Sequence, residues 1–318
     1  MPPFLHRMNM QLGVCLGFFN FNYEQAMATF IGLIAIISWG VLAVLGVYAS
    51  SVPPFQLLFI CFSVSASLLF LTRLIKQDPL FTLPKLTLTQ WIVATGGLFG
   101  FHFCYFLALR YAPPIEASLI AYLWPLLLGI AVANAHQRVF AVIGGALGFI
   151  GCGILVTGGE SIQFNSEYTL GYGLALICAL IWSGYSWFMA GTKSDVEDIG
   201  WISIAVAVLA LGSHLTLESS HWDLSLNAWV SAILLGLGPV GGAFYLWDIG
   251  LKFGNRQLLA SLSFATPVIS SIALFLFGIS TLSAAISMAI VLIMIGALIS
   301  NAVPALIMKH RLRQAARA

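Results

Sequence analysis

Charged residues are scarce in this chain of 318 residues. Only 8% are Asp, Glu, Lys or Arg, whereas 60% are apolar, and the mean hydropathy is +0.99. Soluble domains carry about 25% charged residues, so this chain cannot cover a surface that faces water. Residues 257–308 contain no Asp, Glu, Lys or Arg, and this run suffices for two helical spans of roughly 20 residues each. We therefore expect lipid as the solvent and helices rather than the short alternating strands of a β-barrel.

Motifs of enzymes and metal sites are also missing. The five cysteines form no CxxC pair, so neither a metal site nor a disulfide framework is expected. We find no HExxH, no GxSxG and no P-loop, and these absences argue against an intramembrane enzyme. Without a nucleotide-binding domain the chain by itself is no primary pump. A channel stays open as an alternative, but the chain lacks the polar filter sequence of one. A sensory or structural membrane protein stays open, and no cofactor is expected.

Clusters of charge, Pro and Gly divide the chain into ten apolar segments with short connections. Each segment is long enough for a transmembrane helix, which predicts an all-α membrane protein. The expected spans are 29–50, 55–73, 90–109, 115–134, 139–157, 169–192, 199–217, 226–249, 257–277 and 284–308. Glycines at 96 and 100, at 144 and 148, and at 238 and 242 have the four-residue spacing of close helix packing.

Lys and Arg alternate between the connections in a way that predicts orientation. With the N-terminus in the cytoplasm, twelve of the thirteen Lys and Arg residues fall on the cytoplasmic side, and only Arg110 falls outside. The outer connections instead carry Glu160, Glu167, Glu218 and Asp223. This asymmetry favours an even number of spans in a bacterial inner membrane, with both termini in the cytoplasm.

The chain contains an internal repeat. Residues 108–113 (ALRYAP) and 122–125 (YLWP) match 250–255 (GLKFGN) and 264–267 (FATP) at a constant offset of 142 residues. The unit is five helices, so two tandem copies must insert in opposite senses, as in many secondary transporters. The predicted organisation is an N-terminal extension at 1–26, five-helix repeats at 27–165 and 166–309, and a basic cytoplasmic tail at 310–318.

Several short motifs in this order and spacing carry a family resemblance. They are TFIGLIAI at 29–36, IE at 115–116, YLWP at 122–125, IWSGY at 181–185, WDIG at 247–250 and TPVISS at 266–271. With these motifs the chain resembles the drug/metabolite transporter superfamily, in particular its EamA-type ten-helix members and, among them, bacterial aromatic amino-acid exporters. The resemblance runs from about residue 27 to 308. It implies export of aromatic and other small neutral amino acids by alternating access.

Aromatic side chains within the spans are the candidate binding groups. The alternative is that they anchor the protein at the membrane–water interface, which we expect for Trp91, Trp201 and Trp229 near span ends. Residues three apart, such as His102 and Tyr105, lie on one helix face, and rings around one cavity suit an aromatic substrate. The candidates are Trp39, His102, Tyr105, Tyr122, Trp124, Trp182, Tyr185, Trp187 and Tyr245.

His102 is the one strongly titratable group that we expect deep in a span. Such a residue is a functional hypothesis, here a hydrogen bond to an amino-acid carboxylate. The alternative is a neutral imidazole that bonds a neighbouring carbonyl or hydroxyl group, and the sequence leaves both open.

Four further residues are candidates for hinges or gates. Pro125 and Pro267 occupy equivalent positions within their spans, where a proline removes a backbone hydrogen bond and bends the helix. A static kink is the alternative. Glu116 and Asp248 are expected at helix ends, where Glu116 would favour the helix dipole.

The middle of the membrane lacks carboxylates and cations in this prediction, which favours facilitated diffusion over proton coupling. A proton-coupled metabolite or drug exporter of the same fold is the alternative. The expected partners are a small-molecule substrate and the lipid bilayer, without nucleic acid. The oligomeric state is left open, and a monomer is compatible with the sequence.

Overall fold

The protein is described here from a computed structural model, which covers residues 23–281 and 284–315. Within these residues ten helical spans are long and apolar enough to cross a membrane, and the predicted all-α class is confirmed. Seven spans each contain a single uninterrupted α-helix: α2 (Tyr23–Tyr48), α3 (Pro54–Lys76), α4 (Leu88–Tyr111), α7 (Arg138–Thr157), α8 (Thr169–Ala190, preceded by η1, Ser166–Tyr168), α9 (Asp198–Leu217) and α14 (Ala285–Ala315).

The other three spans are interrupted near their middle. Their parts are α5 (Pro114–Ala121) with α6 (Trp124–Val132), α10 (Leu226–Leu237) with α11 (Gly242–Phe253), and α12 (Arg256–Leu262) with η2 (Ser263–Ala265) and α13 (Thr266–Leu276).

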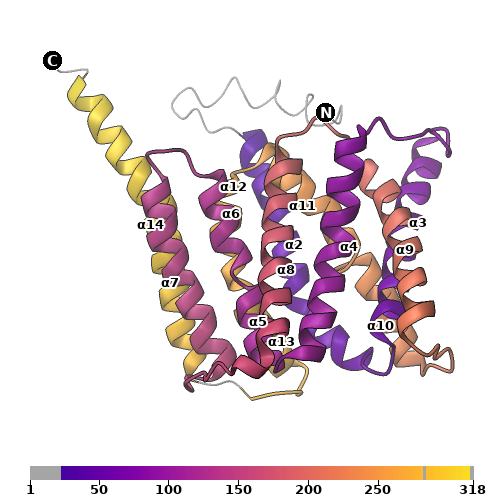
Figure 1. The fold of residues 1–318 in the computed structure, drawn as a ribbon. Coiled ribbons are helices and arrows are strands. Elements are labelled where there is room, and N and C mark those ends of the chain that lie inside the picture. Colours follow the sequence, from indigo (N-terminus) through magenta and orange to yellow (C-terminus); the bar gives the residue numbers. More distant parts are fainter. Residues whose placement is uncertain (1–22, 282–283, 316–318) are drawn as a thin grey trace.

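The spans stand roughly parallel in one bundle, and successive spans run in opposite directions (Figure 1). Helix α2 begins and α14 ends at the same face of the bundle, at the top of Figure 1. We call this the terminal face and the opposite one the far face. Ten spans return the chain to the face from which it started, so the even number predicted from the charges agrees with this arrangement.

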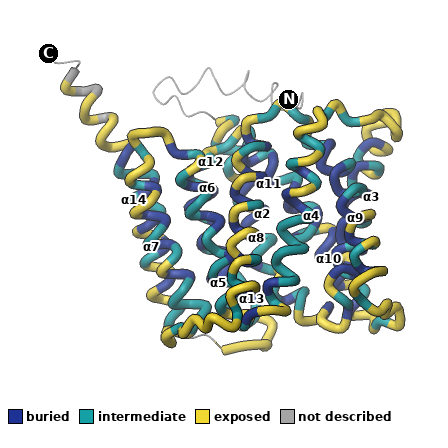
Figure 2. The backbone as a smooth tube through the Cα atoms, in the orientation of Figure 1, coloured by how far each residue is buried: buried dark blue, intermediate teal, exposed yellow. Residues whose placement is uncertain are grey.

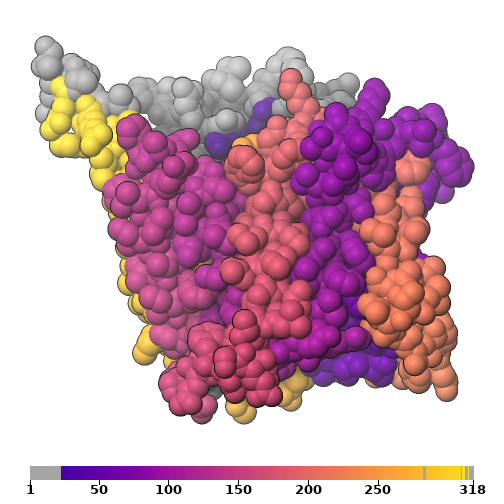
Figure 3. All heavy atoms as spheres, viewed as in Figure 1, coloured from indigo at the N-terminus to yellow at the C-terminus, as the bar shows by residue number. Residues whose placement is uncertain are grey.

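The outside of the bundle is apolar, and the small side chains are inside. Exposed positions follow the outward sides of the helices, whereas buried positions line the interior (Figure 2). Side chains of α4, α7 and α8 form the surface on one side of the molecule (Figure 3). Large hydrophobic residues on such surfaces include Phe30, Ile92 and Leu180, which are 57%, 63% and 52% exposed. Contiguous apolar surface of this extent suits lipid rather than water.

Glycine allows the closest helix contacts. A Cβ atom at Gly144 would overlap the backbone of Gly296 and the side chain of Ser300, so α7 and α14 pack backbone to backbone. Helices α2 and α11 do the same, because a Cβ at Gly250 would lie 2.7 Å from the Cα of Gly32. In lipid there is little hydrophobic drive between helices, and such close van der Waals contact is what holds them together.

The predicted glycine pair at 238 and 242 has a different role. These residues flank a break between α10 and α11 that the sequence analysis did not predict. Pro239 in this break has no N–H to donate, and the backbones of Gly238 and Gly241 are non-helical, with φ/ψ of −112°/−108° and −148°/−81°. The eighth span is therefore discontinuous rather than tightly paired at this point.

Both ends of the described chain differ from the expected boundaries. Helix α2 begins at Tyr23, so residues 23–26 belong to the first span rather than to the predicted extension at 1–26, whose remaining residues lie outside the described ones. Helix α14 continues to Ala315, so most of the predicted tail at 310–318 is helical.

We predict that Gly144→Val destabilises the protein, because α7 and α14 must separate to admit the side chain. Overpacking of this kind costs about 1–3 kcal/mol. Gly96→Val is the matched control, since nothing lies within 4 Å of a Cβ at Gly96. Thermal unfolding in detergent should show a lower midpoint for the first variant only. Equal midpoints would contradict the described packing.

Candidate functional site

The three interrupted spans meet at the middle of the bundle. The chain between α5 and α6 contributes Tyr122, the chain between α10 and α11 contributes Pro239 and Val240, and α13 contributes Thr266 at its first residue. All of these residues line one cavity. Unpaired backbone groups are tolerated within a membrane where they face a cavity rather than lipid, so breaks in the helices mark this site.

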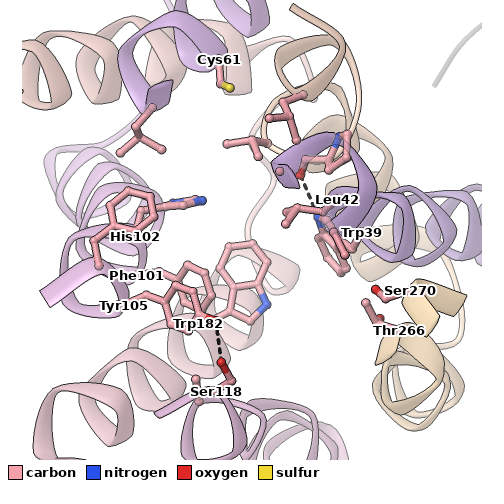
Figure 4. Close-up of a pocket in the computed structure, with 18 of the residues that line it drawn as sticks. Trp39, Leu42, Cys61, Phe101, His102, Tyr105, Ser118, Trp182, Thr266 and Ser270 are labelled. Carbon is pink, nitrogen blue, oxygen red and sulfur yellow. Dashed lines mark hydrogen bonds between the residues drawn. The ribbon is translucent and has the colours of Figure 1, made fainter. Parts of the chain in front are cut away.

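The cavity has a volume of about 360 Å³ and lies in the half of the bundle nearer the far face. Its walls come from the second halves of α2 and α4, the first half of α3, α5, the end of α10 and the start of α13. The volume lies in the range of roughly 300–1,000 Å³ that is usual for small-molecule sites. Figure 4 shows labelled side chains from several of these elements pointing toward the same space.

A cluster of four tryptophans closes the cavity on the side of the terminal face. The ring of Trp39 lies 6.1 Å from Trp124, 5.8 Å from Trp182 and 5.0 Å from Trp247, all in edge-to-face arrangements. Trp124 and Trp182 are themselves 6.1 Å apart. Edge-to-face pairs at these distances are favourable beyond the area they bury. This cluster of indole rings thus forms the floor of the cavity.

Few polar groups face this floor, and most already have partners. The Trp39 indole N–H donates to the Pro239 carbonyl at 3.0 Å and thereby ties α2 to the break between α10 and α11. The hydroxyl groups of Tyr105 and Ser118 bond each other at 2.9 Å. Among the residues that line the cavity none is Asp, Glu, Lys or Arg.

His102 lines the cavity, and its hydrogen bond decides which ring nitrogen carries the proton. Its Nδ1 lies 2.7 Å from the Leu98 carbonyl oxygen, which can only accept. The Nδ1 atom therefore carries the proton, and Nε2 of the neutral ring is an acceptor. The ring points into the cavity in Figure 4. A neutral His102 would thus accept a hydrogen bond from an N–H or O–H group, whereas the carboxylate contact expected from the sequence would need a second proton.

Six of the nine candidate binding residues line the cavity, and three do not. The six are Trp39, His102, Tyr105, Tyr122, Trp124 and Trp182. Trp187 is 54% exposed on the outside of α8, where the structure gives it the position of a lipid-facing anchor. Tyr185 is buried against Trp182 and Gly97, and the Tyr245 hydroxyl donates to the Ser65 carbonyl at 2.9 Å. These two tyrosines support the walls from behind.

Residues not expected from the sequence complete the lining. Phe244 stacks at 5.7 Å on Phe62 and lies 5.6 Å from Trp182, and the hydroxyl-bearing residues Thr266 and Ser270 also line the cavity. The sequence offered one signal for this region, the proline within GLGPVGG at 236–242, because proline next to glycine in mid-span marks a break. The hydroxyl groups had no comparable signal.

The two candidate hinge prolines lie at corresponding breaks. Pro125 is the second residue of α6 and Pro267 the second residue of α13, so each begins the helix after an interruption rather than bending a continuous one. Glu116 lies in the first turn of α5, as expected, and accepts a hydrogen bond from the Tyr172 hydroxyl on α8. This contact joins α5 to α8 near the far face.

Asp248 is not at a helix end, contrary to expectation. It lies inside α11, is 4% exposed, and its carboxylate accepts a hydrogen bond from the Lys252 ammonium at 2.6 Å. Lys252 also donates to the carbonyl and hydroxyl oxygens of Ser194, at 2.7 and 2.9 Å. The sequence analysis did not predict this buried ion pair within the eighth span. Through the bonds of Lys252 to Ser194 the pair joins α11 to the chain after α8 on the terminal side.

A second ion network lies at the terminal face itself. The Glu197 carboxylate bonds Lys76 at 2.7 Å and Arg73 at 3.3 Å. These partners, the Lys76 ammonium first and then the Arg73 guanidinium, lower the pKa of Glu197, and partial burial opposes them. The network joins the end of α3 to the start of α9. Together with the Asp248–Lys252 pair it gives the terminal face a layer of polar contacts.

At the far face one carboxylate joins three helices. Glu218, just after α9, accepts hydrogen bonds from the backbone N–H groups of Phe55 and Gln56 at the start of α3, at 3.0 to 3.2 Å. It also bonds His214 at 3.0 Å and lies 3.7 Å from Arg110 at the end of α4. A carboxylate at a helix N-terminus satisfies free N–H groups and favours the dipole, so Glu218 holds α3, α4 and α9 together.

Comparison with known proteins gives one family. The EamA-like transporter family matches residues 26–157 and again residues 169–302. A relative named aromatic amino acid exporter YddG, from Ancylobacter novellus, is 38% identical over 285 residues, which is 87% of this chain and 98% of the relative. The protein of the same name from Escherichia coli is 28% identical, over 77% of this chain and 86% of its own.

A solved crystal structure shares the fold as well. It superposes with a TM-score of 0.79 at 36% sequence identity, and the match covers 88% of this chain and 99% of that one.

We predict that Lys252→Met costs about 3–5 kcal/mol of stability, because it leaves the buried Asp248 carboxylate without a partner. The double variant Asp248→Leu/Lys252→Met should regain most of this loss, since it removes both charges. Lys76→Met is the control, because its side chain is 53% exposed. Unfolding midpoints in detergent would refute a buried pair if the two lysine variants lost equally little.

Proposed function

The chain belongs to the EamA-like transporter family, and from this premise we propose that it exports aromatic and other small neutral amino acids across the bacterial inner membrane. It is a multi-pass membrane transporter and not an enzyme. The name of its relatives supports the substrate class. The route is the cavity, used by alternating access.

The observation that carries the substrate class is the chemistry of the cavity lining. Aromatic rings and one imidazole surround a space of about 360 Å³ without a charged side chain. Such a space suits a flat apolar side chain through offset and edge-to-face ring contacts, each contributing about 0.5–1.5 kcal/mol beyond area. A passing ammonium group gains from the faces of the same rings.

The packing of the spans supports two five-helix repeats of opposite sense. The family matches each half of the chain once. Helix α4 packs on α8, and α2 packs on α11, whereas α3 pairs with α9 and α7 with α14. In two five-helix repeats, α2 of the first span corresponds to α8 of the sixth, and α4 of the third span to α11 of the eighth. A two-fold axis then exchanges the pair α4–α8 with the pair α2–α11. It maps the pairs α3–α9 and α7–α14 onto themselves. An inverted repeat gives this pattern.

The charges support cytoplasmic termini. The described helix ends and connections at the terminal face contain Arg73, Lys76, Lys85, Arg138, Lys193, Lys252 and Arg256, whereas Arg110 is the one such residue at the far face. By the positive-inside rule the terminal face is cytoplasmic. The cavity then lies on the periplasmic side, and the tryptophan cluster and the Asp248–Lys252 pair separate it from the cytoplasm.

Alternating access requires this cytoplasmic barrier to open while the periplasmic side of the cavity closes. The interrupted spans supply points where half-helices turn without breaking further hydrogen bonds, so Pro125 and Pro267 act as hinges. Opening toward the cytoplasm separates α11 from the chain after α8, which breaks the bonds of Lys252 to Ser194. Asp248 holds Lys252 within α11 and is a gate residue in this sense. On the periplasmic side the bond between Glu116 and Tyr172 joins α5 to α8, and Glu116 is a gate residue there.

Transport proceeds as facilitated diffusion in this proposal. The cavity lining has no carboxylate that would carry a proton with the substrate, and the buried Asp248 is neutralised by Lys252. A proton-coupled exporter of the same fold is the second candidate, because His102 is a titratable group that faces the cavity.

We predict that labelled phenylalanine and tryptophan cross liposome membranes only where the protein is present, without ATP. Facilitated diffusion requires no more than the gradient of the substrate, so flux should occur from either side. Empty liposomes are the control. Absence of protein-dependent flux for every aromatic amino acid would refute the proposed substrate class. Accumulation against the substrate gradient, driven by an imposed pH gradient, would favour the proton-coupled alternative.

We also predict that Trp124→Ala and His102→Ala reduce this flux severalfold, because both remove groups that line the cavity. Trp187→Ala should leave the flux near that of the wild type, since Trp187 faces outward at 54% exposure. Initial rates over a range of phenylalanine concentrations, corrected for the amount of inserted protein, provide the measurement. A similar loss in all three variants would mean that the cavity is not the transport route.

A further inference from the structure

Thr266 carries a hydroxyl group without a partner. In the described part of the chain four buried side-chain polar atoms lack a hydrogen bond, those of Thr95, Trp201, Gln257 and Thr266. Thr266 alone among these four lines the cavity, and its residue is 7% exposed. A buried polar group left unpaired is costly, so its presence at a binding site indicates a missing ligand atom.

Neighbouring hydroxyl groups on the same span behave differently. Ser261, Ser263 and Ser271 each donate to the carbonyl oxygen four residues earlier, at 3.0, 2.8 and 2.9 Å. Such bonds to the own helix satisfy a serine or threonine within a membrane. Among the described contacts neither Thr266 nor Ser270 makes a bond of this kind. Both donors therefore remain available to a ligand.

Thr266 and Ser270 share one wall of the cavity. They are four residues apart on α13, so their side chains lie on the same helix face. Both line the cavity, and Figure 4 shows them together near Trp39, across the space from His102. Rotation about χ1 turns the hydroxyl group of Thr266 toward the cavity without movement of the helix.

We propose that Thr266 and Ser270 form the subsite that binds the carboxylate of the transported amino acid. A carboxylate accepts hydrogen bonds only, and two hydroxyl donors on adjacent turns match its two oxygens. This assignment deepens the proposed function and rests on it for the identity of the substrate.

His102 does not compete for the carboxylate. Its bond to the Leu98 carbonyl makes the free ring nitrogen an acceptor, which repels a carboxylate oxygen. The carboxylate therefore lies at α13, and the aromatic side chain of the substrate extends toward Phe101, Tyr105 and Trp182. In this orientation the acceptor nitrogen of His102 meets the substrate's side chain, not its carboxylate.

The test compares two ligands that differ only in the carboxylate. Phenylalanine and phenethylamine share ring and ammonium group, and binding of each is measured by quenching of tryptophan fluorescence in detergent, which does not depend on transport. The ratio of their dissociation constants cancels a general weakening of the site. Thr266→Val should reduce the preference for phenylalanine over phenethylamine by about tenfold or more, the size of a lost hydrogen bond to a charged group. Ser270→Ala should reduce it in the same direction.

Matched variants separate the hydroxyl group from its surroundings. Thr266→Ser keeps the donor and should retain the preference of the wild type. Ser271→Ala removes a hydroxyl that bonds Pro267 and is absent from the cavity lining, so it should change nothing. An unchanged preference in both Thr266→Val and Ser270→Ala would overturn the subsite, as would a loss of preference in His102→Ala alone.

The same variants distinguish this proposal from the proposed function. Binding that shifts as described, in a protein without flux of aromatic amino acids, would uphold the subsite and refute transport of this substrate class. Flux in liposomes together with an unchanged binding preference would uphold the function and refute the subsite. If neither ligand bound to the wild type, the subsite would be refuted as well.

Discussion

The need to pair every backbone polar group within lipid governs this structure. No water is available in the hydrocarbon region, so helices satisfy their own hydrogen bonds and close glycine contacts bring them together. Three spans depart from continuity, at Tyr122–Leu123, at 238–241 and at η2. Tyr122, Pro239 and Val240 from the first two departures and Thr266 directly after η2 line the same cavity. The cost of an interrupted helix is thus confined to the place where a ligand, water or a neighbouring side chain can take up the freed groups.

The cavity combines a rigid apolar floor with few polar atoms. Most of these atoms are engaged within the protein, as in the bond from Trp39 to the Pro239 carbonyl and the pair of Tyr105 and Ser118. Polar closure lies elsewhere, in the Asp248–Lys252 pair and the network around Glu197 near the terminal face. The aromatic rings line the cavity, whereas the ion pairs lie outside it. A substrate in the cavity can therefore leave without breaking an ion pair with the protein, which is consistent with facilitated diffusion.

Much of the fold was predictable because a span in lipid must be a long apolar helix, and such segments are visible in the sequence. Each predicted span overlaps one observed span, and the ends differ by a few residues, the first span beginning at Tyr23 rather than 29. Pro125 and Pro267 marked the places of two interruptions, although the sequence analysis expected bends in continuous helices there. The third was missed because Gly238 and Gly242 also fit the spacing of helix packing, and a spacing alone does not say whether glycine admits a neighbour or releases the helix.

The sequence by itself determined the class of protein, the number of spans and the resemblance to a family, since hydrophobicity and charge placement depend only on composition along the chain. Tertiary structure decided which side chains meet. Trp182 and Trp187 are five residues apart on α8, yet one belongs to the tryptophan cluster and the other is 54% exposed, because helix rotation directs them to different sides. Likewise, nothing in the sequence distinguished the hydroxyl group of Thr266 from those of the neighbouring serines. Only the folded chain shows that it lacks a hydrogen-bond partner.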